Sequence, residues 1–133
     1  MTPLALPLLA LSLLETGGRV LLGSLYVLSG WSGIAGFAGT AGGMARRGVP
    51  AARELLAISI VFRIAVGALF MLGIAQGTCA LALIAFTLAA SAMMLDFWRM
   101  EGRERAAAIN SWRNNIAIIG GLLLALADGA VPG

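Results

Sequence analysis

Three charged residues stand within long apolar stretches of this chain: Glu15, Arg19 and Arg63. A carboxylate or a guanidinium is costly inside a membrane, so each needs a partner, water or a ligand there. Glu15 and Arg19 are four residues apart, in the order that favours an ion pair on one helix face. With Arg63 expected at a similar depth, the three would form an intramembrane cluster with one excess positive charge.

That excess charge has several candidate partners. An anionic lipid headgroup, a quinone oxygen, a substrate anion or a carboxylate of another subunit could balance it. A purely structural arrangement would explain the same residues, because Arg63 could pair with Glu15 while Arg19 reaches another carboxylate, backbone carbonyls or water. The sequence leaves these alternatives open.

The sequence contains no histidine, which removes the usual ligand of haem, copper, iron and zinc sites. We therefore expect no metal site and no cofactor held by this chain alone, which leaves quinone or lipid at an interface. Cys79 is the single cysteine and cannot form an internal disulfide. It is either a small buried hydrophobic residue or a reactive thiol that needs a partner thiol from elsewhere.

The composition is that of one transmembrane domain covering residues 1–133. Hydrophobic residues make up 60% of the chain and charged residues 11%, and the mean hydropathy is +0.96. The formal charge is +3, yet there is no lysine, so we expect membrane lipid as a partner and no nucleic acid. Residues 4–14 resemble a signal-peptide core, but no basic residue precedes them, and we expect the chain to keep them as the start of its first helix.

Four apolar stretches predict an all-α fold, an integral membrane four-helix bundle. The expected spans are residues 4–30, 52–73, 79–98 and 110–127. A very short connection at residues 76–78 predicts that the second and third spans form an antiparallel hairpin. The fourth span is the least apolar of the four, because its strongly apolar part is limited to residues 116–127.

Most of the arginines lie in or beside two polar segments, the loops at residues 31–51 and 99–109. They are Arg46, Arg47, Arg53, Arg99, Arg103, Arg105 and Arg113. The positive-inside rule places both loops in the cytoplasm. The sequence therefore predicts a multi-pass protein of the bacterial inner membrane, with both termini in the periplasm.

Further interface residues are expected at the cytoplasmic ends of the spans. Trp31, Trp98 and Trp112 fall at the headgroup depth that indole rings favour. Asp96 and Arg99 are three residues apart, within reach of each other on one helix. They predict an interfacial ion pair, with a proton or substrate gate as the alternative.

Glycine occupies every third position across residues 30–42, between the first and second spans. Small residues allow a segment to lie close against a neighbouring helix or the membrane surface, which favours an interfacial or re-entrant piece. A flexible linker explains the same composition. A collagen-like helix is excluded, because this run has no proline and is far too short.

Four short motifs follow one another along the chain. They are RVLLGSLYVLSG at 19–30, FAGTAGGMARRGVP at 37–50, Asp-Phe-Trp at 96–98 and NNIAIIGGLLLAL at 114–126. In this order they resemble the DoxX family of small four-helix bacterial membrane proteins, over roughly residues 17–127. The chain has Arg63 where the family usually carries a glutamate, and Leu95 where a histidine often precedes the Asp-Phe-Trp motif.

The resemblance implies a four-helix bundle of the inner membrane. It also implies a link to electron transfer, since some family members look like subunits of oxidoreductase assemblies that pass electrons from sulfur compounds or thiols to quinone. Three hypotheses follow. The chain is a non-catalytic accessory subunit of a respiratory, photosynthetic or other electron-transfer complex, a membrane subunit of a quinone-linked oxidoreductase, or, with the least support, a small-molecule transporter. We expect other membrane protein subunits as partners in the first two cases.

Overall fold

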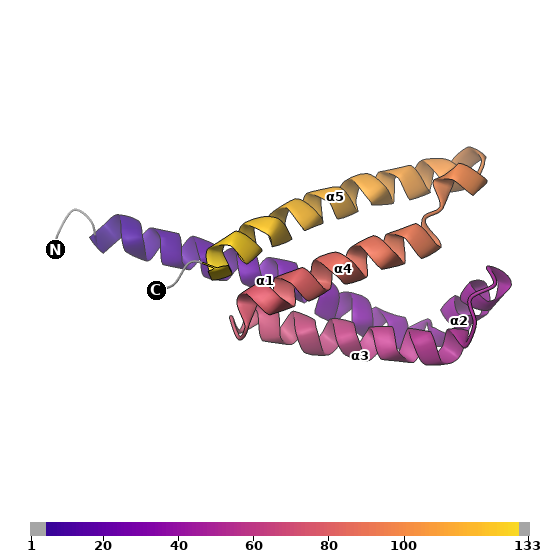
Figure 1. The fold of residues 1–133 in the computed structure, drawn as a ribbon, viewed down its shortest axis with the longest axis horizontal. Helices are drawn as coiled ribbons and strands as arrows, with labels where there is room; N and C mark the ends of the chain where they lie inside the picture. The colour runs from indigo at the N-terminus through magenta and orange to yellow at the C-terminus, as the bar shows by residue number, and fades with distance from the viewer. Residues whose placement is uncertain (1–4, 131–133) are drawn as a thin grey trace.

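The computed structural model describes residues 5–130, and their regular structure is entirely helical (Figure 1). The elements are α1 (Ala5–Ala35), α2 (Phe37–Arg46), α3 (Ala52–Met71), α4 (Gln76–Met94), the short 3-10 helix η1 (Phe97–Arg99) and α5 (Gly102–Ala130). Four of these helices are long, namely α1, α3, α4 and α5. The predicted all-α fold class is confirmed.

Three segments are long and apolar enough to cross a membrane. They are Leu8–Ala35 in α1, Ala52–Met71 in α3, and Gln76–Arg99, which covers α4 and η1. Helix α5 has 29 residues but a more polar first half, and it does not meet the same criterion among the described residues. A fourth crossing at 110–127 stays a prediction.

The helix boundaries differ from the predicted ones in the first loop. Residues 31–51 were expected to be a loop, but α1 continues to Ala35 and α2 begins at Phe37. Only Gly36 separates the two helices, and its carbonyl still accepts the Thr40 N–H at 3.0 Å. A helix satisfies its own backbone groups, which a glycine-rich loop beside an apolar helix could not do.

The second boundary difference lies between α3 and α4, which form the expected antiparallel hairpin. Helix α4 already starts at Gln76, so the turn occupies residues 72–75 rather than 76–78. Gly73 and Ala75 both adopt left-handed backbone angles there, with φ of 75° and 49°. The reversal of the chain therefore needs only four residues, which lie before the polar Gln76.

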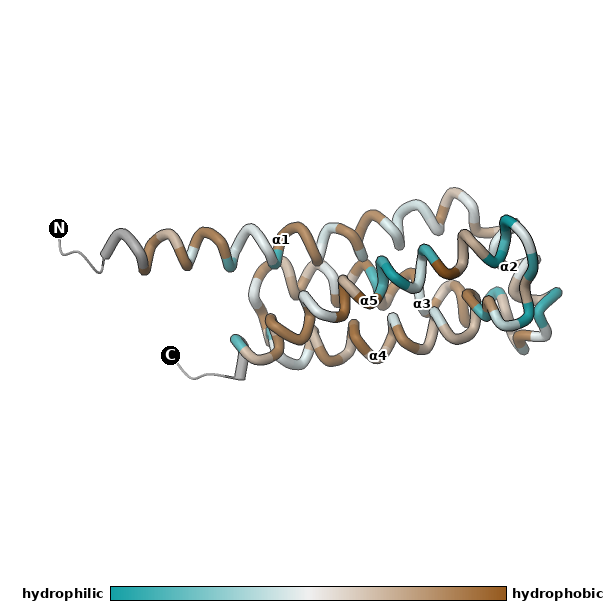
Figure 2. The backbone as a smooth tube through the Cα atoms, turned by 90° about the horizontal axis from the view of Figure 1, so that it is seen from above, coloured by the Kyte–Doolittle hydropathy of each residue, from teal (hydrophilic) through white to brown (hydrophobic). Residues whose placement is uncertain are grey.

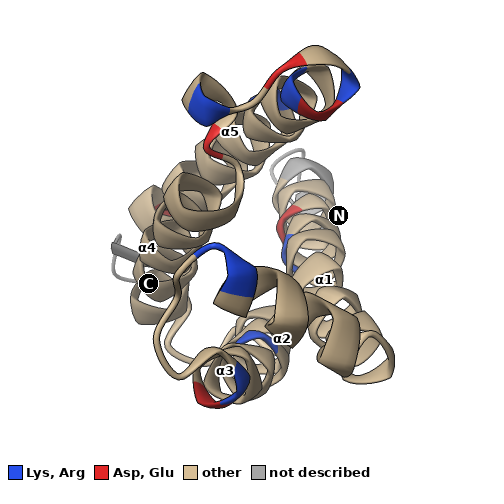
Figure 3. Cartoon of the chain, turned by 90° about the vertical axis from the view of Figure 1, so that its right-hand side faces the viewer, with Lys and Arg blue, Asp and Glu red and all other residues tan. Residues whose placement is uncertain are grey.

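The long helices pack as two antiparallel pairs, α1 with α3 and α4 with α5. The pairs meet near the α3–α4 turn and diverge toward the end that carries α2, as Figures 1 and 3 show. The main core lies where they meet and includes the fully buried Phe70, Leu83 and Leu122. A smaller cluster seats Ala41 and Met44 of α2 against α3. The diverging end therefore has less apolar packing between the pairs.

Glycines bring α1 and α3 into close contact. A Cβ atom on Gly67 would lie 3.0 Å from the Gly23 carbonyl oxygen, and one on Gly30 would lie 3.1 Å from the Ile60 carbonyl oxygen. The first part of the glycine-rich run therefore packs against a neighbouring helix. This agrees with the interpretation of the run as a closely packed segment and not with a flexible linker. Gly39, later in the run, has nothing within 4 Å of an added Cβ.

The polar segments gather at one end of the molecule. Figure 2 shows hydrophilic residues around α2 and in the first half of α5, and Figure 3 shows basic residues, in blue, at the same end. At the opposite end, the first part of α1 extends past the other helices (Figures 1 and 2). The two arginine-bearing segments therefore lie on one side, as the predicted topology requires. The orientation in the membrane stays a prediction.

Candidate functional site

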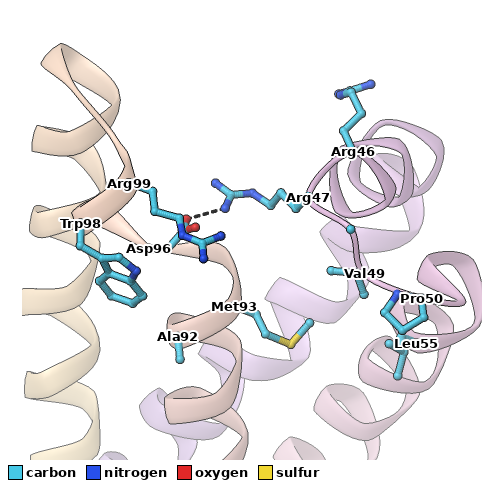
Figure 4. A pocket seen from close by; sticks show the side chains of 11 residues that line it. Arg46, Arg47, Val49, Pro50, Leu55, Ala92, Met93, Asp96, Trp98 and Arg99 are labelled. Carbon is cyan, nitrogen blue, oxygen red and sulfur yellow. Dashed lines mark hydrogen bonds and ion pairs between the residues drawn. The ribbon is translucent and has the colours of Figure 1, made fainter.

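A cavity of about 640 Å³ opens between the two helix pairs at their diverging end. We call it the arginine cleft. Its charged and aromatic lining consists of Arg46, Arg47, Asp96, Trp98 and Arg99. Its apolar lining includes Val49, Leu55, Ala92 and Met93. The cleft is open at its surface, and Figure 4 shows its lining side chains.

An ion pair crosses this cleft. Arg47 Nη1 donates to Asp96 Oδ1 at 2.5 Å, and the two side chains are 27% and 15% exposed. It is the one ion pair within residues 5–130, and it links the end of α2 to the segment between α4 and η1. The Arg99 side chain lies beside Asp96 in the same cleft (Figure 4). The predicted pairing of Asp96 with Arg99 is therefore replaced by one with Arg47.

Arg63 lies halfway along α3 and is held by hydroxyl groups. Its Nη1 donates to Ser29 Oγ at 2.7 Å, and its Nη2 donates to Ser59 Oγ at 3.2 Å. Its guanidinium carbon lies 5.7 Å from the centre of the Phe86 ring, a cation–π arrangement. Within the described residues no carboxylate pairs with Arg63, so its charge is distributed among neutral partners.

Arg63 does not join Glu15 and Arg19 in one cluster, which corrects the sequence prediction. The register of the antiparallel α1–α3 pair is the reason, because Gly23 faces Gly67 and Gly30 faces Ile60. Arg63 accordingly meets Ser29, which lies ten residues, or about 15 Å of helix, beyond Arg19. The two arginines stand at different depths of the bundle.

Glu15 and Arg19 instead line a second cavity, of about 380 Å³, which we call the terminal cavity. Leu22, Phe70 and Leu124 contribute apolar walls, and Gln76 and Asp128 contribute polar groups. Arg19 Nη2 donates to Thr16 Oγ1 at 3.4 Å, whereas the buried Arg19 Nε has no hydrogen-bond partner. The structure therefore keeps two of the three predicted residues at one site, without an ion pair between them.

Sequence reasoning missed Gln76 and Asp128 as part of this site. Gln76 Nε2 donates to the Ala125 carbonyl oxygen at 2.9 Å and to Asp128 Oδ2 at 3.1 Å. Both residues stand at helix ends on the side where Glu15 lies. The sequence did offer one indication of their role, because both residues lie near the predicted outer ends of the third and fourth spans.

The predicted interface tryptophans have different surroundings. Trp31 and Trp98 are 70% and 59% exposed. Trp112 Nε1 instead donates to the Leu95 carbonyl oxygen at 2.6 Å, so it ties α5 to the end of α4. That carbonyl lies just past the end of α4, and it also accepts the Phe97 N–H at 2.8 Å. Contact of these rings with lipid headgroups stays a prediction.

Polar contacts also join helices in the interior. The hydroxyl groups of Tyr26 and Thr87 share a hydrogen bond of 2.5 Å between α1 and α4. Asn115 Nδ2 donates to Ser91 Oγ at 2.8 Å between α5 and α4. Such bonds fasten helices that have few other means of alignment in a membrane. They join the two helix pairs and align α5 on α4.

Cys79 is buried, and its thiol donates to the Ile74 carbonyl oxygen at 3.4 Å. It belongs to the main core with Phe70 and Leu83, which agrees with the packing interpretation. Within the described part of the chain, no three of the potential ligand residues lie close enough together to hold a metal ion.

Comparison with protein families gives one match, the DoxX model, over residues 14–96. The match covers more than half of the chain and ends at Asp96, so the motif at 114–126 lies outside it. Comparison with curated proteins and with solved structures gives no match. The family match and the three apolar spans together lead to the conclusion that the chain belongs to the DoxX family and is a multi-pass membrane protein.

Proposed function

We propose that this DoxX family protein is a non-catalytic accessory subunit that packs against other membrane proteins of an electron-transfer complex. The observation that carries the proposal is a set of glycines in apolar helices that make no close helix contact within the described residues, although one of them, Gly18, also lines the terminal cavity. Gly17 and Gly18 of α1 and Gly120 of α5 have nothing within 4 Å of an added Cβ. Glycine inside a helix costs about 0.5–1 kcal/mol relative to alanine, and close helix contact is its usual compensation in membranes.

The surroundings of Gly17 and Gly18 support a helix as the missing neighbour. Leu14 and Leu21 lie one turn to either side on the same helix face, and they are 71% and 73% exposed. Only 6% of the apolar window in α1 is buried, against 22% in α3 and 28% in the third span. Leucines beside a pair of glycines give the surface a shallow notch, which suits a second apolar helix.

The electron-transfer part of the proposal is supported by the family. The chain belongs to the DoxX family, and the resemblance implies a link to oxidoreductase assemblies because some family members look like subunits of them. Because the sequence has no histidine, we expect any histidine-ligated redox cofactor of such an assembly to be held by other chains. This chain would then provide a helix surface against which the other subunits pack, and would hold them in position.

Photo-crosslinking in native membranes tests the accessory role. A crosslinker at Leu14 or Leu21 is expected to capture a protein chain, whereas one at Ile58, exposed on α3, is expected to capture lipid. The double variant Gly17→Leu/Gly18→Leu is expected to reduce the co-purified partner about tenfold, which corresponds to about 1.4 kcal/mol of binding. Gly39→Leu is the matched control, since Gly39 also faces open space but lies in α2. Lipid adducts alone at Leu14 and Leu21 would contradict the proposal.

A membrane subunit of a quinone-linked oxidoreductase is the second candidate, and the terminal cavity favours it. The unpartnered Arg19 Nε in a cavity with apolar walls could donate to a quinone oxygen. Organic extraction of the same purified material distinguishes the two roles. Quinone retained by the isolated chain, and lost in Arg19→Leu but not in Arg63→Leu, would favour this candidate over the accessory role.

A further inference from the structure

We propose that the arginine cleft binds the phosphate group of an anionic phospholipid, whose acyl chains run along the apolar side of the cleft between α3 and α4. The inference is independent of the accessory role, because the cleft lies at the diverging end of the bundle, whereas Gly18 lines the terminal cavity with Gln76, next to the α3–α4 turn.

The charge of the cleft favours an anion. Three guanidinium groups line it against a single carboxylate, so the lining has an excess of two positive charges. One N–H group of Arg47 donates to Asp96, and a guanidinium has five N–H donors in all. Within residues 5–130, the Arg46 and Arg99 side chains have no hydrogen-bond or ion-pair partner. The cleft thus has donors left for a phosphate group, the anion to which arginine is best matched.

The positions of the side chains place that phosphate beside Arg99. Figure 4 shows the Arg47 and Arg99 side chains both next to Asp96, with Arg99 turned toward Met93, while Arg46 stands at the rim and points away. Arg47 is held by Asp96, so Arg99 is the guanidinium free to face the interior of the cleft. Arg46 is long enough to close over a bound headgroup from the rim.

The apolar side of the cleft identifies the ligand as a lipid rather than a soluble phosphate. Leu55 of α3 and Ala92 and Met93 of α4 line it, and all three belong to apolar segments able to cross a membrane. The cleft opens where the two helix pairs diverge (Figure 1), beside the apolar segments of α3 and α4. An acyl chain can occupy this apolar side without losing any hydrogen bond. A water molecule there would lose hydrogen bonds that it makes in bulk water.

The predicted topology adds an independent argument. The positive-inside rule places this end of the bundle in the cytoplasmic leaflet, where anionic lipids produce a negative surface potential. Trp98 also lines the cleft and is 59% exposed, as expected for an indole ring at headgroup depth. A phosphate held beside Arg99 would lie at this same level.

Native mass spectrometry of the full chain in detergent tests the site, with phosphatidylglycerol and phosphatidylcholine as probes. We expect the unmodified chain to bind phosphatidylglycerol about tenfold more tightly than phosphatidylcholine. Both lipids carry a phosphate group, but the excess positive charge of the cleft repels the choline cation of phosphatidylcholine. Arg46→Gln/Arg99→Gln is expected to lose the preference. Arg53→Gln/Arg103→Gln removes the same charge from exposed residues outside the cleft and is expected to keep it.

Each other result would overturn the proposal. Equal losses in the two double variants would mean diffuse attraction to a basic surface, and no preference in the unmodified chain would mean no site. Glycerol phosphate at matched ionic strength separates the two sources of a phosphate group. If it displaces phosphatidylglycerol at millimolar concentration, the cleft serves a soluble phosphorylated compound instead. Circular dichroism of all variants confirms that each is folded as the unmodified chain is.

Discussion

Gly67→Leu is expected to separate α1 from α3 and to destabilise the protein by about 3 kcal/mol, near the upper end of the usual cost of overpacking. A Cβ at this position would lie 3.0 Å from the Gly23 carbonyl oxygen and 3.1 Å from the Tyr26 Cβ. These neighbours are backbone or close to it, so they cannot move aside as the end of a flexible side chain would. The rest of a leucine side chain has no room unless the helices part.

Thermal unfolding of the purified protein in detergent measures this effect. Gly120→Leu is the matched control, because Gly120 also lies inside an apolar helix but has nothing within 4 Å of an added Cβ. The control is expected to unfold at nearly the same temperature as the unmodified chain. Equal midpoints for the two variants would show that α1 and α3 do not approach each other through Gly23 and Gly67.

Phe70→Ala is expected to destabilise the protein by about 3 kcal/mol, at the lower end of the range for a buried aromatic residue. Phe70 is fully buried where the two helix pairs meet, in one cluster with Tyr26, Leu83 and Leu122. Its removal leaves a cavity and deletes dispersion contacts, which are the main attraction between helices in lipid. The substitution should therefore loosen the contact between the two helix pairs.

The same unfolding assay separates this packing role from a general effect of truncation. Leu72→Ala, at a residue that is 71% exposed, is expected to change the midpoint little. Phe70→Leu should recover part of the loss, since it restores most of the buried volume. A midpoint for Phe70→Ala that matches the Leu72→Ala control would contradict the assignment of Phe70 to the core.

Sequence reasoning located the helices well because apolar stretches long enough to cross a membrane have few other structures available. It did not predict the helical structure in residues 31–51, where we expected a loop that holds an interfacial or re-entrant segment, or else a flexible linker. Glycine lowers helix propensity in water, but beside an apolar helix an unpaired backbone is the larger cost. The helical structure of Phe37–Arg46 follows from that balance.

The sequence could not place side chains from different helices opposite each other. Arg63 was assigned to Glu15 and Arg19 because all three lie near the middle of apolar stretches, but depth depends on the register of α1 against α3. That register is set by the close approach of Gly23 and Gly67. The Arg47–Asp96 pair was missed for a similar reason, since its members are 49 residues apart and only the folded bundle brings them together.

The unequal lengths of α1 and α3 have a consequence for the membrane itself. The apolar segment of α1 has 28 residues and that of α3 has 20, which correspond to about 42 Å and 30 Å of helix. A typical hydrocarbon layer of about 30 Å matches α3, and tight packing on α3 prevents α1 from tilting independently. The surplus of α1 therefore produces hydrophobic mismatch along one edge of the protein. Either the bilayer thickens locally at that edge, or the apolar surface of a neighbouring protein shields the leucines from water.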